Sequence, residues 1–460
     1  MFSAIVKRPA IWALSTLVFA ALLLFSFHPN APTVRFLPKA TWQKDDLQLG
    51  LSRLLQHLYP ERVSNSTTPA PWNKWVTHNQ RSLSGLFACL ETGVCGENQT
   101  SVVLLGSAHF IGPLEGHVGG EDIWGLSTIE ALDAMGYTYI FSPHWDGTEH
   151  PANVHVTMEF YHMFPDLVKI IIAEAEEIEL CWYDRRCILS PENPYGIPAW
   201  KMFSWGFWAG PANPLGAKWS LNPEDFHRDH SWIPPNTYLG YSVEHGCKSV
   251  PYIPHAERPN PSTIYIYAKW GSYFFNHPWG MDYYRSVAEE FDGRAHLLMG
   301  THGELPDDFP VDVVENLGQM KQKQFYEMLS GASLVIGVGA PTTSPSMYDA
   351  LCLGVPVINP ILQWDESDPT NRDLWYAQHG TLKDLDPPYV YNVFKGDKEG
   401  FMRAVKDALA HPIESYILPH MTMGAVEGRL GKIIEGDWKA EAQKLLEERQ
   451  KTGDGPLFTV

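Results

Sequence analysis

The chain has 460 residues, of which 44% are hydrophobic and 19% are charged, and its formal net charge is −19. This length exceeds what one hydrophobic core usually serves, so we expect two lobes with accessory segments, and the apolar content excludes a chain that is disordered throughout. A nucleic-acid partner is excluded, because binding to a phosphate backbone needs clustered Lys and Arg on a basic surface.

The N-terminus predicts a membrane anchor. Residues 9–27 contain no charged side chain, and Lys7 and Arg8 precede them. A segment of this length just crosses a bilayer, and cations before it favour a cytoplasmic N-terminus. The alternative is a cleaved signal peptide, whose apolar region is usually shorter and ends in a small-x-small site that this segment lacks. We therefore expect a cytoplasmic tail at 1–8, a signal anchor at 9–27 and a luminal body.

Residues 28–100 predict a mobile luminal stem, because Pro, Ser, Thr and Asn are scattered through them. Two acceptor triplets for N-glycosylation lie in this stretch, and they begin at Asn65 and Asn98. Both agree with a luminal body, although such triplets are also common by chance.

The six cysteines are too few to define a disulfide scaffold. An oxidising lumen would close short loops, and two pairs enclose such loops: Cys89 with Cys95, and Cys181 with Cys187. Cys247 and Cys352 remain. Because Cys352 lies on an apolar helix face, a buried free thiol is expected there. All six would be reduced only if the body were not luminal.

Alternating strands and helices begin after residue 100. Residues 102–105 predict a strand, a glycine-rich loop follows, residues 121–135 predict a helix, and residues 137–142 predict another strand. A strand, a helix and a strand with short connections begin a parallel, doubly wound sheet. We assign residues 101–262 to an N-terminal, acceptor-side lobe.

A second series follows a stretch at 188–261 that is rich in Trp, Pro and Gly and shows no sustained period. The predicted elements of this series are strands at 263–268, 295–299 and 334–338 and helices at 281–291 and 322–330. Two such series predict an α/β protein with two similar lobes facing a cleft. We assign residues 263–435 to a C-terminal lobe and residues 436–460 to a final helix and tail.

The most informative stretch runs from Leu334 to Pro360. It reads as a buried strand, a loop of Gly, Pro, Ser and Thr, a short helix with one acid, and a second apolar run. Ser344 or Ser346 can cap the helix while its free N–H groups attract a diphosphate, and Asp349 on the first turn can hold ribose hydroxyls. The alternative for Asp349 is a carboxylate that only compensates the helix dipole. This unit predicts a sugar-nucleotide pocket and a glycosyltransferase.

Two further side chains fit a sugar transfer with inversion. Glu121, at the start of the helix after the glycine-rich loop and beside apolar residues, is the candidate base. Glu115 and Asp122 are its competitors, and the alternative is a glutamate that the helix dipole favours. Lys269, at the carboxyl end of a strand, would neutralise a leaving diphosphate without a metal or cofactor, unless it is only a surface lysine.

Several sequence blocks give the chain a resemblance to glycosyltransferase family 18, the Golgi N-acetylglucosaminyltransferase V enzymes. The blocks occur in consistent order between residues 101 and 435: GG-E at 119–121, KWSLNPEDF at 218–226, YLGYSVE at 238–244, YAKW at 267–270, the stretch 316–360, and IESYILPHMTMGAVEGRL near the end.

The resemblance implies a GT-B fold with two Rossmann-like lobes and a single-pass Golgi membrane protein with its catalytic body in the lumen. The implied donor is UDP-N-acetylglucosamine, and the implied reaction is inverting, metal-independent transfer to the 6-hydroxyl of an α1,6-linked mannose of N-glycans on glycoproteins. Glu121 matches the proposed base of the family, Lys269 its strand-end lysine, and Asp349 the position of a donor-lobe glutamate.

The chain also departs from the family pattern. Thr342, Thr343 and Ser344 replace Tyr-Glu-Gly, and ILQWDESD stands where a lysine-rich segment is expected. Two alternatives therefore stay open. One is a GT-B transferase with another donor or acceptor, and the other is a catalytically silent, membrane-tethered glycan-binding protein.

Overall fold

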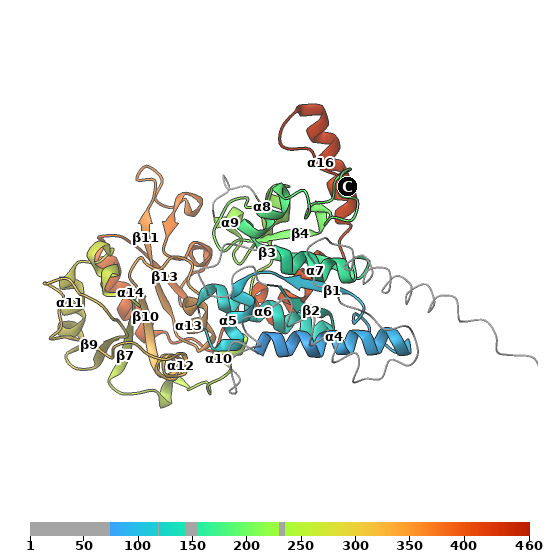
Figure 1. Ribbon diagram of the computed structural model, residues 1–460. Coiled ribbons are helices and arrows are strands. Elements are labelled where there is room, and N and C mark those ends of the chain that lie inside the picture. The colour runs from blue at the N-terminus through green and yellow to red at the C-terminus, as the bar shows by residue number, and fades with distance from the viewer. Residues whose placement is uncertain (1–73, 118, 143–153, 230–234) are drawn as a thin grey trace, which may run out of the picture. The chain divides into compact units, whose positions relative to one another are not determined.

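The computed structural model describes residues 74–117, 119–142, 154–229 and 235–460 (Figure 1). The predicted tail, the predicted anchor and most of the predicted stem, with Asn65, lie outside the described residues. Among the residues that are described, no helix combines the length and the apolar character that crossing a membrane requires.

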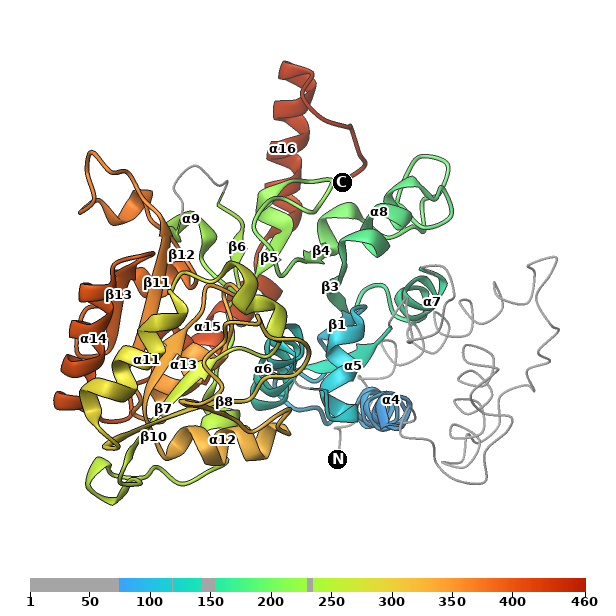
Figure 2. The same ribbon diagram turned by 90° about the vertical axis from the view of Figure 1, so that its left-hand side faces the viewer.

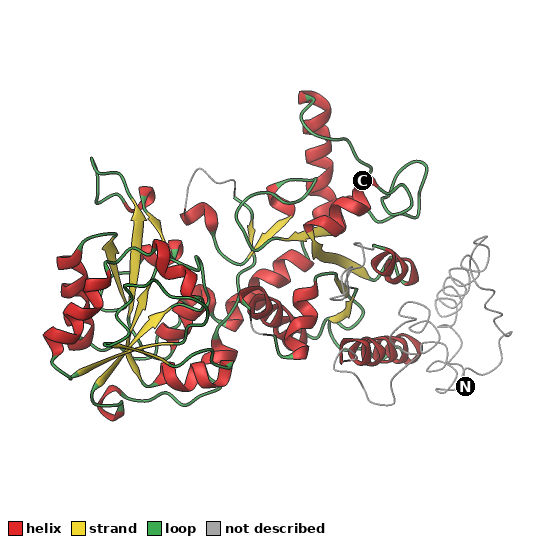
Figure 3. Cartoon of the chain, turned by 60° about the vertical axis from the view of Figure 1, so that its left-hand side comes forward, coloured by secondary structure: helices red, strands yellow, loops and turns green. Residues whose placement is uncertain are grey.

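The chain divides into two units. Unit 1 contains the described residues up to 117 together with 128–221 and 427–460, and unit 2 contains 118–127 and 222–426. Each unit has its own largely parallel sheet with helices packed on it, so the prediction of two doubly wound sheets is confirmed (Figure 3). The boundaries differ from the predicted ones, because the segment that carries Glu121 and residues 222–262 belong to unit 2.

The sheet of unit 1 is parallel. Its strands lie in the order β2 (Thr138–Phe141), β1 (Val102–Leu105), β3 (Val168–Glu174), β4 (Met202–Trp205) and β5 (Ser220–Asn222). Most of their residues are buried, as expected for parallel strands covered by helices. The α-helices in this part of the chain are α4 (Lys74–Thr92), α5 (Ala108–Glu115), the second half of α6 (Gly120–Met135), α7 (His155–Met163), α8 (Ala175–Tyr183), most of α15 (Met423–Ile434) and α16 (Trp438–Thr452).

Helix α4 lies in the predicted stem, so the prediction of a mobile segment is wrong for residues 74–92. Leu83 and Leu86 of α4 are fully buried. Asn79 binds the edge of β2, because its Nδ2 donates to the Phe141 carbonyl at 2.8 Å and its Oδ1 accepts from the Phe141 N–H at 2.9 Å. A buried polar residue in the middle of the packed face weakens the apolar pattern that would have revealed this helix.

The sheet of unit 2 has the strand order β12-β11-β10-β7-β8-β9, with β13 beside β11. The strands are β7 (Ser262–Tyr267), β8 (Ala295–Met299), β9 (Val314–Asn316), β10 (Ala332–Gly337), β11 (Val357–Gln363), β12 (Tyr376–Ala377) and β13 (Val390–Phe394). All pairs are parallel except β11 with β12. The three strands predicted from residue 263 onward are confirmed to within two residues.

Helices cover both faces of this sheet. On one face, α11 (Met281–Phe291) and α14 (Lys398–Ala410) pack together over a core that includes Ile264 and Ile266 of β7 (Figure 2). Successive strand residues point to opposite faces, and the rings of Tyr265 and Tyr267 contact Phe325 of α12 (Gln322–Ser330). The remaining elements of unit 2 are α9 (Phe226–Asp229), β6 (Thr237–Tyr238), α10 (Glu244–Cys247), α13 (Ser346–Cys352) and the start of α15 (Met423–Ile434).

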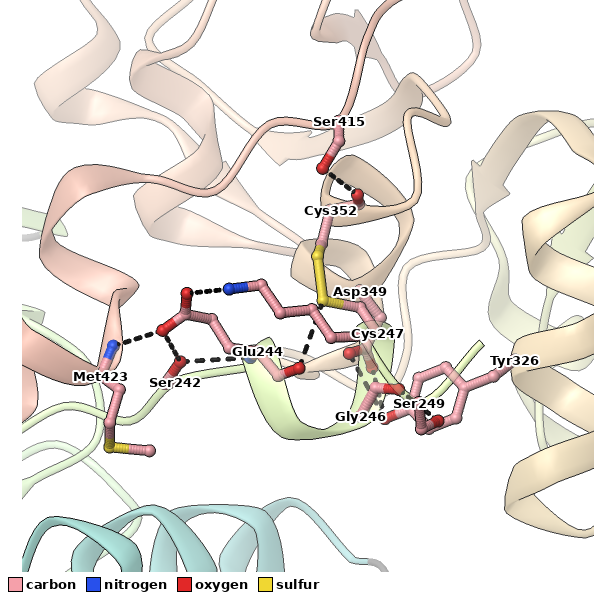
Figure 4. The surroundings of a disulfide bond; sticks show 11 residues. Ser242, Glu244, Gly246, Cys247, Ser249, Tyr326, Asp349, Cys352, Ser415 and Met423 are labelled. Atoms are coloured by element: carbon pink, nitrogen blue, oxygen red, sulfur yellow. Dashed lines mark hydrogen bonds and ion pairs between the residues drawn. A yellow bond between two sulfur atoms is a disulfide. The ribbon is translucent and has the colours of Figure 1, made fainter. Parts of the chain in front are cut away.

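Three disulfides join all six cysteines. Two of them are the pairs proposed from sequence spacing, Cys89 with Cys95 and Cys181 with Cys187. The third joins Cys247 of α10 to Cys352 of α13, so the prediction of a free thiol at Cys352 is wrong. The two residues are 105 positions apart, and only the packing of α10 on α13 brings their Cα atoms to 6.2 Å (Figure 4).

Replacing both Cys247 and Cys352 by Ala should lower the free energy of unfolding by about 5 kcal/mol, because this bond closes a long loop of the unfolded chain. The matched control replaces Cys181 and Cys187, whose separation is 6 residues; it should cost about 2 kcal/mol on the same chain-entropy argument. Urea denaturation followed by tryptophan fluorescence measures both, and equal losses would contradict the loop-length argument.

Candidate active site

Two of the predicted donor-side residues, Lys269 and Ser344, lie on segments that leave the same edge of the unit 2 sheet. β7 and β10 are parallel neighbours, so the residues after each strand emerge at the same edge, where open α/β sheets bind ligands. Lys269 follows β7, and residues 338–345 form the loop after β10. The Tyr267 hydroxyl and Ser344 Oγ lie 2.6 Å apart and join the end of β7 to that loop.

Lys269 is an exposed cation at this edge. Its backbone is fixed, since its carbonyl accepts from the His302 N–H at 3.2 Å. Its ammonium forms no ion pair with the residues that the structure describes, so it is open to an anion. Among the residues that the structure describes, no group of three or more His, Cys, Asp or Glu side chains is arranged to hold a metal ion.

The start of α13 differs from the prediction of open amides. Pro345 occupies the N-cap position in a helical conformation, and its side chain cannot accept a hydrogen bond from the helix amides. The Ser346 N–H donates to Ser344 Oγ at 3.4 Å, and the Met347 N–H donates to the Ser344 carbonyl at 3.3 Å. Because this first turn closes on itself, the amides that were expected to receive a diphosphate already have acceptors. Ser344 is 8% exposed, whereas Ser346 is partly exposed.

Asp349 is buried against α12. Its carboxyl is 2% exposed and accepts from the Tyr326 hydroxyl at 3.3 and 3.4 Å (Figure 4). A Cβ on Gly246 would lie 2.1 Å from that hydroxyl, so glycine is needed there for close packing. Burial raises the pKa of Asp349 to about 8, and the Tyr326 hydrogen bond acts in the opposite direction. In this structure the carboxyl ties α13 to α12, and a contact with ribose would require it to turn away from Tyr326.

Asp349 should make the stability of unit 2 depend on pH. Its pKa is about 8 in the folded protein against an ordinary 3.8, so between these values the folded state holds a proton that the unfolded state releases. The stabilisation is complete below about pH 4 and is lost as the pH rises toward 8. Urea denaturation at pH 5 and pH 7.5 should show a loss on the order of a few kcal/mol in the wild type that Asp349→Asn lacks. Parallel pH dependence in the two proteins would contradict this.

Glu121 lies on the first turn of α6, within the segment assigned to unit 2. It is partly exposed and forms no hydrogen bond or ion pair with the described residues, Lys269 included. The competing acids are less accessible, since Asp122 accepts from the Gly119 N–H at 2.8 Å and the Glu115 carboxylate oxygens are buried. Of these three acids, Glu121 is therefore the one open to a substrate.

Sequence reasoning missed a buried polar cluster that holds α13. Glu224, 2% exposed, accepts from the hydroxyls of Tyr241 at 3.0 Å, Tyr348 at 2.9 Å and Thr381 at 3.2 Å. Burial and the nearby Glu224 raise the pKa of both tyrosines well above the ordinary value. Burial lowers the pKa of the neighbouring His379 to about 3, so this ring is neutral. The only signal in the sequence was that Glu224 lies inside the block KWSLNPEDF.

A model of a known family accounts for most of this chain. The model described as glycosyltransferase family 18 matches residues 149–443, more than half of the chain. The chain belongs to glycosyltransferase family 18. The resemblance inferred from the ordered blocks is thereby confirmed.

Curated relatives carry transferase names. Alpha-1,6-mannosylglycoprotein 6-beta-N-acetylglucosaminyltransferase A from Cricetulus griseus is 26% identical over 266 residues, which are 55% of this chain and 34% of the relative. The B enzyme of that name from Homo sapiens is 24% identical over 231 residues, which are 47% of this chain and 27% of the relative. The family-18 chain thus spans about a third of the length of the curated relatives it matches.

Solved structures resemble the chain more distantly. A putative UDP-N-acetylglucosamine 2-epimerase from Listeria monocytogenes is 12% identical with a TM-score of 0.42, over 78% of this chain and 100% of that one. Sucrose-phosphate synthase from Thermosynechococcus elongatus is 13% identical with a TM-score of 0.40, over 76% and 98%. The architecture of the family-18 chain therefore rests on its own two sheets.

Proposed function

We propose that the chain is an inverting glycosyltransferase that moves N-acetylglucosamine from UDP-N-acetylglucosamine to the 6-hydroxyl of an α1,6-linked mannose of N-glycans. Family membership and the printed names of the curated relatives support this. The structural observation that carries it is the exposed Lys269, which follows β7 at the carboxyl edge of a parallel sheet and forms no ion pair with the described residues.

In the proposed reaction, Glu121 takes the proton of the acceptor 6-hydroxyl as its oxygen attacks the anomeric carbon. The new bond forms on the face opposite the bond to the diphosphate oxygen, which breaks, so the configuration inverts. Lys269 stabilises the negative charge that develops on departing UDP, and Ser346, a partly exposed residue at the start of α13, donates its hydroxyl to the same diphosphate. Because the lysine supplies this charge, the proposal requires no metal ion or cofactor.

We also propose that residues 9–27 anchor the protein in the Golgi membrane with its body in the lumen. The three disulfides support an oxidising compartment. Asn98 is a constrained glycosylation site, because its Nδ2 donates to the Met135 carbonyl at 2.9 Å.

The test is release of UDP from UDP-N-acetylglucosamine in the presence of an N-glycan acceptor, with mass analysis of the glycan. The expected product carries one added N-acetylhexosamine, at equal rate before and after exhaustive chelation. Nucleotide release from a different sugar donor in a screen would favour another GT-B specificity. Glycan binding without any nucleotide release would favour the silent binding protein.

A further inference from the structure

Gln378 holds the loop that joins β10 to α13. It follows β12, and its side chain is 1% exposed. Its Oε1 accepts from the Gly339 N–H at 2.8 Å, and its Nε2 donates to the Pro341 carbonyl at 3.1 Å. Its backbone carbonyl accepts from the Thr343 N–H at 3.0 Å. One residue thus binds the backbone of three alternate loop positions.

The sheet anchors Gln378 on its other side. Its N–H donates to the Pro360 carbonyl of β11 at 3.0 Å. The next residue, His379, exchanges two hydrogen bonds with the side chain of Asn359, of 3.0 and 3.2 Å. A Cβ on Gly337 would lie 2.3 Å from the Gln378 Oε1, so glycine at the end of β10 provides the room that this side chain occupies. The sheet therefore holds Gln378 in place on the side opposite the loop.

The loop that Gln378 holds contains one residue in a backbone conformation that is rare for residues other than glycine. Thr343 has φ of +53°, in the left-handed region that non-glycine residues rarely adopt. It is 7% exposed, and its Oγ1 has no hydrogen-bond partner among the described residues. A strained residue with an unpaired hydroxyl persists only where its surroundings impose it, and such residues concentrate at ligand sites. The hydrogen bond from the Thr343 N–H to the Gln378 carbonyl is one of the contacts that hold Thr343 in this conformation.

We propose that Gln378 is a positioning residue for the donor: it fixes residues 339–344 in the conformation that receives the diphosphate of a UDP-sugar beside Lys269. Gln378 is buried and acts through the loop, so it does not touch the substrate itself. This inference rests on the proposed function, because the loop is taken as part of the donor site. Its physical basis is preorganisation, since a displacement of about 1 Å in a binding loop is enough to lose much of the affinity.

The test is Gln378→Ala, measured by calorimetric titration with UDP and by steady-state kinetics. We expect the Kd for UDP and the KM for the donor to rise about tenfold to a hundredfold. The KM for the acceptor should stay unchanged. Amide hydrogen exchange should accelerate in residues 338–346 and not in the strands beside them.

Two further variants separate positioning from general stability. Gln378→Glu keeps an acceptor for the Gly339 N–H but loses the donor to Pro341, so it should fall between the wild type and Gln378→Ala, and it carries the test if the alanine variant fails to fold. Asn79→Ala is the matched control, because Asn79 is also a buried amide that binds a backbone N–H and a backbone carbonyl, in unit 1. It should lower thermal stability and leave the Kd for UDP unchanged.

If both Gln378 variants bind UDP like the wild type while losing stability like Asn79→Ala, Gln378 has only a structural role. The inference is then overturned, and the proposed function still stands. If the wild type binds no UDP, the proposed function fails and the inference fails with it. The wild-type titration therefore distinguishes the two failures.

Discussion

Replacing Glu121 by Gln should lower kcat by about 10²–10⁴-fold while leaving the affinity for UDP unchanged. The amide has nearly the size of the carboxylate but cannot accept the proton of the acceptor hydroxyl. Glu121 is partly exposed and has no hydrogen-bond partner among the described residues, so the exchange disturbs no packing. The loss should therefore appear in the chemical step and not in folding.

Steady-state kinetics and calorimetric titration with UDP check this expectation, and Asp122→Asn is the matched control on the same helical turn. Its side-chain oxygen can still accept from the Gly119 N–H, as Asp122 does at 2.8 Å, so this variant should keep its activity. Full activity in Glu121→Gln would move the base elsewhere, and an inactive Asp122→Asn beside an active Glu121→Gln would assign the base to Asp122.

The elements that sequence predicted best are those with a strong apolar period. Residues 281–291, 322–330 and 295–299 match α11, α12 and β8 at both ends. The short elements between 188 and 261 were missed because two to four residues are too few to display a period.

The residues of the candidate site also differ in whether the sequence could predict them. Lys269 and the β10 loop were predictable, because a strand followed by a loop places its next residues at a sheet edge whatever the rest of the chain does. Gln378 and Gly339 are 39 positions apart, and Glu224 and Tyr348 are 124 apart. No local pattern relates residues at such distances. These contacts depend on the strand order and on the packing of α13, which are properties of the whole fold.

Pro345 shows how a local rule can mislead. Two serines before an apolar run are typical of a helix cap with free amides behind it. Here Tyr267 engages the Ser344 hydroxyl, and a proline takes the N-cap position. In the proposed donor site, the positive charge that faces a diphosphate therefore has to come mainly from a side chain, and we propose that Lys269 supplies it.

Lys269→Ala should accordingly lower kcat by about 10²–10³-fold, since the group it removes faces charge that develops only as UDP departs. Lys269→Arg keeps the positive charge but places it at a different distance from the backbone, so it should recover part of the rate. The matched control is Lys323→Ala, which removes a lysine of unit 2 whose side chain is 81% exposed on α12; it should behave like the wild type.

The division of the Lys269→Ala effect between kcat and KM decides what the lysine does. A cation that binds the diphosphate equally in the ground state and in the transition state would raise KM and leave kcat unchanged. A fall in kcat without a matching rise in the Kd for UDP instead places the interaction in the transition state. Unchanged kcat, KM and Kd for UDP would contradict any role of Lys269 in the transfer.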